Sequence, residues 1–202
     1  MIKALLYKDI KNIKPYALTM LIIGILLCFM LNEQGFSVVL SVLASGLVFT
    51  SFSLDDAAGH TKEEVAIIGN RKIIVEEKYL FALMVIALGA IESFLVECIL
   101  GILSGCFSAN FSLSIAIQSL SMGALVCAIT IPFIIRLGSE KARIIVFFFI
   151  FAPILFSSLI QNIADKETLI SGFIPLFFIV TAIVIAPLSY FISVQLFKDK
   201  EL

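Results

Sequence analysis

The amino-acid sequence predicts an all-α membrane protein with six transmembrane helices, an N-terminal amphipathic interfacial helix and a short cytoplasmic helix. Of its 202 residues, 61% are apolar and 14% are charged, whereas soluble domains average about half apolar and about a quarter charged. A helix needs ~20 apolar residues to cross lipid, and six runs reach or approach that length. They lie at about 15–31, 36–54, 80–103, 113–135, 144–159 and 173–197.

The distribution of lysine and arginine predicts which side of the membrane each connection faces. Positive charge in short loops is kept on the cytoplasmic side. Thirteen of the fourteen basic residues lie in alternate segments, namely 1–14, 55–79, 136–143 and 198–202, and only Lys166 lies in the opposite connections. We therefore expect one transmembrane domain over residues 1–202, with both termini in the cytoplasm.

The first fourteen residues predict an amphipathic helix that lies on the membrane surface. Five apolar residues recur at helical spacing, namely Ile2, Leu5, Leu6, Ile10 and Ile13. Four lysines lie mostly on the opposite side and would face anionic lipid headgroups; they are Lys3, Lys8, Lys11 and Lys14. Pro15 would then join this interfacial helix to the first span.

The loop between the second and third spans predicts a second short helix. Residues 55–60 form a break that contains a turn-prone glycine. Thr61, followed three residues later by Glu64, has the pattern of a capping box in which Thr61 is the N-cap. The helix would end at Gly69, and another helix would begin at Arg71 and continue into the third span. A connector needs only a few residues, so this segment is either a juxtamembrane linker or a docking element.

Two carboxyl groups in the third span are the candidate polar site. Glu92 lies near its middle, and a charge at that depth costs a few kcal/mol. Small and polar residues recur every four positions along one stripe, at Gly89, Ser93, Glu97, Gly101 and Gly105, and such a stripe allows another helix to pack closely. Each glutamate is either a protonated, hydrogen-bonded carboxyl or part of a polar wall that attracts a cationic cargo.

Three stretches carry a resemblance to a known family: "LLYKDIKNIK", "RKIIVEEKYL" and "IPFIIRLGSEKARII". The chain resembles the small permease subunits of ABC type-2 exporters. More narrowly, it resembles phenol-soluble modulin exporter permeases and related peptide or lantibiotic-immunity permeases of Gram-positive bacteria. It departs from the family at 67–70, where Ile-Ile-Gly-Asn stands and the family often has Leu-Pro before the Arg-Lys pair.

The resemblance implies a permease that pairs with a second permease subunit, as a homodimer or heterodimer, and with cytoplasmic ABC ATPase subunits. The helix 61–68 would be the coupling helix in the 55–79 coupling loop. Its ATPase-contacting residues would be Thr61, Lys62, Glu63, Glu64, Val65 and Ile68, with Arg71 and Lys72 nearby. The translocation path would include Glu92, Ser93, Glu97 and Gln118.

The resemblance further implies a multi-pass protein of the bacterial cytoplasmic membrane that exports amphipathic or hydrophobic peptides. The chain has no G-x-x-x-x-G-K-[ST] phosphate loop, so we expect it not to be an enzyme and to bind no cofactor or metal itself. ATP and Mg would belong to the partner ATPase. A net charge of −1 gives no indication of nucleic-acid binding.

Two other classes of function stay open at this point. One is an ion-coupled secondary transporter that uses Glu92 and Glu97, although the sequence shows no convincing inverted repeat. The other is a membrane subunit that confers immunity or acts as a scaffold without transporting anything. The first predicts transport without an ATPase, and the second predicts ATPase or peptide binding without movement across the membrane.

Overall fold

The computed structural model describes residues 1–31, 38–105, 107–142, 144 and 167–199. Across these ranges the chain forms helices and no strand, so the predicted all-α fold is confirmed there. The helices are α1 (Ile2–Leu31), α2 (Val38–Ala58), α3 (His60–Ile68), α4 (Arg71–Leu103), α5 (Ala109–Leu137) and α7 (Glu167–Asp199). The predicted fifth span lies, apart from its first residue, outside the described residues.

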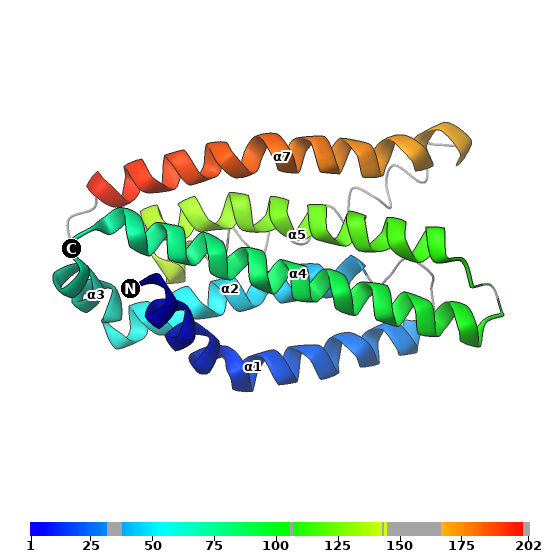
Figure 1. The fold of residues 1–202 in the computed structure, drawn as a ribbon, viewed down its shortest axis with the longest axis horizontal. Helices are drawn as coiled ribbons and strands as arrows, with labels where there is room; N and C mark the ends of the chain where they lie inside the picture. Colours follow the sequence, from blue (N-terminus) through cyan, green and yellow to red (C-terminus); the bar gives the residue numbers. More distant parts are fainter. Residues whose placement is uncertain (32–37, 106, 143, 145–166, 200–202) are drawn as a thin grey trace.

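The five long helices lie side by side along the length of the molecule (Figure 1). α4 is central, because it packs against α1, α2, α5 and α7. The short helix α3 lies at one end of the bundle, together with the N-terminus and the C-terminal end of α7. We call this the α3 end of the bundle.

Three segments of the described chain are long and apolar enough to cross a membrane: α4, α5 and the part of α7 from Ile179 to Lys198. α4 has 33 residues and at 1.5 Å per residue is ~50 Å long, more than the ~30 Å of a hydrocarbon core. The predicted span from Leu80 onward is itself ~36 Å long, which is enough to cross. On the predicted span limits, residues 71–79 form an extension of α4 beyond the apolar run at the α3 end.

The interfacial helix and the first span form one helix, α1, with Pro15 inside it. Proline removes a backbone hydrogen bond and clashes with the preceding turn, and α1 bends near its start in Figure 1. The apolar side of its N-terminal part does not lie wholly against lipid, because Ile13 is buried in the protein core.

The predicted break at 55–60 is wrong in its extent, because α2 continues to Ala58 and the turn lies at Gly59. Asp55 therefore lies inside a helix, where two lysine side chains from other helices pair with it. Gly59, with a left-handed φ of 70°, turns the chain directly into α3.

The predicted capping box is also wrong. α3 begins at His60, which places Thr61 inside the helix, and the N-cap position makes no side-chain hydrogen bond. Glu64, the other half of the predicted box, is instead bound by Lys8 of α1. The Glu64 carboxylate therefore forms a long-range ion pair with Lys8 and not the local hydrogen bond to the backbone that the capping pattern predicts.

The end of α3 and the start of α4 agree with the sequence. Gly69 adopts a left-handed φ of 68°, and its N–H donates to the carbonyl of Val65, which ends α3. The Asn70 side chain accepts a hydrogen bond from the backbone N–H of Lys72 and caps α4. α4 then runs from Arg71 to Leu103, the limits predicted from the sequence.

The main apolar core lies toward the α3 end of the bundle. Buried side chains from all five long helices meet there, among them Ile13 of α1, Val48 of α2, Phe81 of α4, Ile131 of α5 and Phe197 of α7. The charged extension of α4, residues 71–79, therefore lies next to this core. The core shields neighbouring polar groups from water.

Candidate functional site

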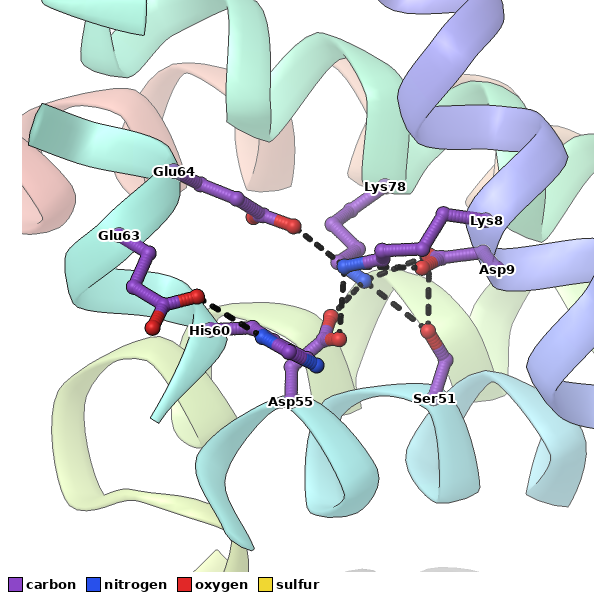
Figure 2. A network of polar contacts seen from close by, with 8 residues as sticks. All are labelled: Lys8, Asp9, Ser51, Asp55, His60, Glu63, Glu64 and Lys78. Atoms are coloured by element: carbon purple, nitrogen blue, oxygen red, sulfur yellow. Dashed lines mark hydrogen bonds and ion pairs between the residues drawn. The ribbon is translucent and has the colours of Figure 1, made fainter. Parts of the chain in front are cut away.

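Charged side chains from α1, α2, α3 and α4 converge at the α3 end (Figure 2). Two lysines and three carboxylates, together with one serine, form a connected set of ion pairs and hydrogen bonds. We call this set the ionic cluster; its members are Lys8, Asp9, Ser51, Asp55, Glu64 and Lys78.

Lys78 of α4 is the buried centre of the ionic cluster, with only 3% of its surface exposed. Its ammonium donates to Asp9 Oδ2 at 2.5 Å, to Asp55 Oδ2 at 2.5 Å and to Ser51 Oγ at 2.9 Å. The Nζ atom also lies 5.1 Å from the centroid of the Phe52 ring, within cation–π range. One side chain thus joins α4 to both α1 and α2.

Lys8 of α1 is half-buried and bridges two other helices. Its ammonium donates to Asp55 Oδ1 of α2 at 2.7 Å and to the Glu64 carboxylate of α3. Burial alone would lower the pKa of Lys8, but its hydrogen bonds to Asp55 and Glu64 outweigh burial and raise the pKa above its ordinary value. Lys8 therefore stays charged throughout the physiological pH range.

Asp55 accepts hydrogen bonds from both lysines, one on each carboxylate oxygen. Burial would raise the pKa of this carboxyl, but the charge of Lys78 and the hydrogen bonds from Lys78 and Lys8 hold it below its usual range. Asp55 is thus an ionised carboxylate inside α2.

Lys8 corrects part of the membrane-interface prediction. Lys3, Lys11 and Lys14 are exposed, whereas Lys8 points inward to the ionic cluster. Within the described residues the backbone of α3 packs against α2 and α4 but not against α1. The Lys8–Glu64 pair therefore links two helices that are otherwise separated.

A small cavity of about 20 Å³ lies beside the ionic cluster, room for about one water molecule. Asp55, Asp56, Glu64 and Lys78 contribute its polar wall, and apolar side chains from α2, α4, α5 and α7 complete it. Nearby, the Asp56 carboxylate accepts a hydrogen bond from the backbone N–H of Ser139 at 3.0 Å.

The residues of α3 separate into an inner and an outer face. Val65 and Ile68, both predicted to contact an ATPase, are partly buried and pack against the protein core. The outer face includes the predicted residue Glu63 together with Ala66 and Ile67, and Ile67 is 79% exposed. The side chains of Thr61 and Lys62 lie outside what the structure describes.

The basic pair that opens α4 lies beside α7. The Arg71 guanidinium donates to the backbone carbonyls of Phe197 at 3.1 Å and Lys198 at 2.7 Å. These are carbonyls of the last turn of a helix, which lack partners within it. Lys72 forms an exposed pair with Glu76 at 3.4 Å. Arg71, predicted as a coupling residue, thus also fastens the end of α7.

The polar residues predicted for the translocation path do not share one environment. Glu97 is buried and Glu92 is half-buried on α4, while Gln118 of α5 is partly buried. Ser93 Oγ donates to the Gly89 carbonyl and lies 2.8 Å from Ser119 Oγ of α5. Ser93 is therefore a packing residue between α4 and α5 in this arrangement.

Sequence reasoning missed most of the ionic cluster, although the sequence contains a signal for it. Asp9 lies on the apolar stripe of α1, four residues after Leu5 and four before Ile13. Lys78 lies on the apolar stripe of α4, four residues after Ile74 and four before Ala82. An acid and a base on two stripes that must both be buried are expected to pair.

The family model described as "ABC-2 family transporter protein" matches residues 4–198, nearly the whole chain. No curated protein matches the chain, and no solved structure matches it. In the parts of the chain that the structure describes, no group of three or more His, Cys, Asp or Glu side chains is placed to hold a metal ion.

Proposed function

Because the chain belongs to the ABC-2 family of transporter proteins, a family of membrane transport components, we propose that it is the permease subunit of an ATP-driven exporter. In this proposal ATP and Mg bind to separate ATPase subunits in the cytoplasm, and a second permease subunit completes the pathway. The chain would lie in the bacterial cytoplasmic membrane with six spans and both termini in the cytoplasm.

The observation that carries the proposal is the outer face of α3. Ile67 is a large apolar side chain that is 79% exposed, at the end of the bundle where the basic segments lie. The inner face of the same helix packs on the core through Val65 and Ile68. A fixed helix that presents an apolar side chain outward suits a cleft in another protein, and we assign it to the ATPase.

The ionic cluster supports a mechanical role for α3. Glu64 is bound by Lys8, which is also bound to Asp55 of α2. Asp55 in turn binds Lys78 of α4. A displacement of α3 by the ATPase would therefore act on α1, α2 and α4 together. An exporter requires such transmission of movement from the ATPase to the membrane helices, whereas a non-transporting scaffold does not.

The proposed cargo is an amphipathic or hydrophobic peptide. Support comes from the two carboxyl groups of α4 inside the predicted span, Glu92 and Glu97, which would attract a cationic or amphipathic chain. An ion-coupled transporter would use the same carboxyl groups, and that function is distinguished by whether transport needs the ATPase.

We expect Ile67→Ala to weaken ATPase retention by about tenfold, since truncating a buried interface anchor costs more than ~1 kcal/mol. The tagged chain would be purified in mild detergent from its native host, and its bound proteins and ATPase activity would be measured. The melting midpoint of the purified chain should be unchanged, because Ile67 makes few contacts within it.

The neighbouring substitution Ile68→Ala is the matched control. Ile68 packs against the core, so this variant should lower the melting midpoint and still retain the ATPase. Equal retention in wild type and Ile67→Ala would argue against α3 as the docking element. A wild-type chain that purifies without an ATPase would remove the exporter proposal and favour the ion-coupled alternative.

The cargo proposal predicts that Glu92→Gln reduces cargo-stimulated ATPase activity and transport several-fold, because the substitution removes a charge and keeps the side-chain shape. Glu97→Gln should also reduce both if the path reaches that carboxyl. Glu140→Gln, at an exposed carboxyl outside both α3 and α4, serves as the control for loss of an acidic group. Unchanged transport and ATPase stimulation in both Glu92→Gln and Glu97→Gln would contradict a role of these carboxyl groups in binding cargo.

A further inference from the structure

Glu77 is a buried carboxyl that the proposed mechanism does not use. It lies on α4 beside Lys78, and only 2% of its surface is exposed. Its Oε1 atom has no hydrogen-bond partner among the residues that the structure describes. The adjacent ammonium of Lys78 does not satisfy it, since that ammonium is directed at Asp9, Ser51 and Asp55.

The charges around Glu77 do not balance. Its electrostatic neighbours are Lys8 and Asp9 of α1, Glu64 of α3 and Lys78 of α4. With Asp55 of α2, which both lysines bind, the described residues of the region supply four carboxyl groups and two ammonium groups. If all six were ionised, two excess negative charges would be shielded from water, and such charge is costly unless a proton neutralises it.

We propose that Glu77 is a proton-binding site, which holds a proton while α1, α3 and α4 pack as they do here and releases it when these helices separate. The site forms only in the packed arrangement, because the carboxylates that repel its negative charge come from α1 and α3. Three of the four carboxyl groups have a lysine partner, which leaves Glu77 as the group that takes the proton.

The direction of the shift in pKa agrees with the geometry. Burial raises the pKa of Glu77 to about 8, with Lys78 and Lys8 opposing the change and Asp9 and Glu64 adding to it. A carboxyl whose pKa is higher in the packed state stabilises that state at low pH. The contribution is fully present below the ordinary value of 4.5 and is lost as the pH rises through about 8.

One consequence for transport rests on the proposed function. If α3 is the contact for the ATPase, then proton release from Glu77 loosens α3 from the bundle and links coupling to cytoplasmic pH. The proton site itself needs no ATPase, so it can be tested on the purified chain. Failure of the exporter proposal would leave this test unaffected.

The experiment compares the unfolding of wild type, Glu77→Gln and Glu140→Gln in mild detergent between about pH 6 and about pH 9. Glutamine mimics the protonated carboxyl and cannot release a proton. The unfolding equilibrium constant of wild type should rise relative to that of Glu77→Gln by on the order of 10- to 100-fold over this range. Glu140→Gln, which changes an exposed carboxyl, should follow wild type.

Infrared spectroscopy provides a second measurement that does not depend on how well the variant folds. Wild type should show a protonated-carboxyl carbonyl band near neutral pH that weakens as the pH rises through about 8. The difference spectrum against Glu77→Gln should assign it. A wild-type carboxyl band that does not change with pH would overturn the proposal, and so would an identical pH dependence of stability in wild type and Glu77→Gln.

Discussion

Lys78→Met is expected to lower the free energy of unfolding by about 3 kcal/mol or more. The substitution removes the ammonium that hydrogen-bonds Asp9, which keeps a 3.4 Å ion pair with Lys8, and it removes one of the two ammonium groups that bind Asp55. Both carboxylates are buried, and removing one partner of a buried ion pair typically costs about 3–5 kcal/mol, because the remaining charge stays desolvated. Methionine keeps the apolar length of the side chain, so the loss reports the charge.

The measurement is the denaturant or thermal midpoint of the purified chain in mild detergent. Lys72→Met is the matched control, because it makes the same change on the same helix at a side chain that is 54% exposed. Its pair with Glu76 is a surface pair worth at most about 1 kcal/mol. Similar midpoints for the two variants would mean that the ionic cluster does not hold the α3 end together.

Asp55→Ala is the second large expected effect, and its neighbour provides the comparison. Asp55 binds both lysines of the ionic cluster, so its removal should cost about 3 kcal/mol. Asp56 is exposed and accepts one backbone hydrogen bond, from Ser139, so Asp56→Ala should cost about 1 kcal/mol. The two adjacent aspartates therefore differ because Asp55 is buried and ion-paired, whereas Asp56 is exposed and accepts a backbone hydrogen bond.

The Asp55 effect also has a predicted pH dependence. The pKa of Asp55 is lower in the folded protein than its ordinary value of 3.8, so its contribution is present above 3.8 and is lost as the pH falls through the folded value. The difference in stability between wild type and Asp55→Ala should therefore shrink in acid. A difference that stays constant down to about pH 2 would contradict the ion pairs as its origin.

The helices themselves were largely predictable from the sequence. α4 begins after the Gly-Asn pair and ends at Leu103 because capping residues and apolar run length act over a few neighbouring positions. The end of α3 at Gly69 follows from the same kind of local signal, since glycine adopts a left-handed φ at low cost. The start of α3 was not predictable in this way, because Glu64 is held by a residue of another helix.

The candidate site was only partly predictable. The position of α3 between the second and third predicted spans was visible in the sequence, but its outward side chain, Ile67, was not among the predicted coupling residues. Helical spacing shows which residues share a face and does not show which face meets the core. Val65 and Ile68 are such a case, because their contacts with the core come from other helices.

The sequence by itself determined that this is a helical membrane protein with a charged segment between two apolar spans, because run length, charge distribution and glycine positions act locally along the chain. Only the tertiary structure decided which charges pair. Lys8 and Glu64 are 56 residues apart, and Lys78 and Asp9 are 69 apart. Such pairs form because burial makes an unpaired charge costly, and which charges are buried together depends on how the helices pack.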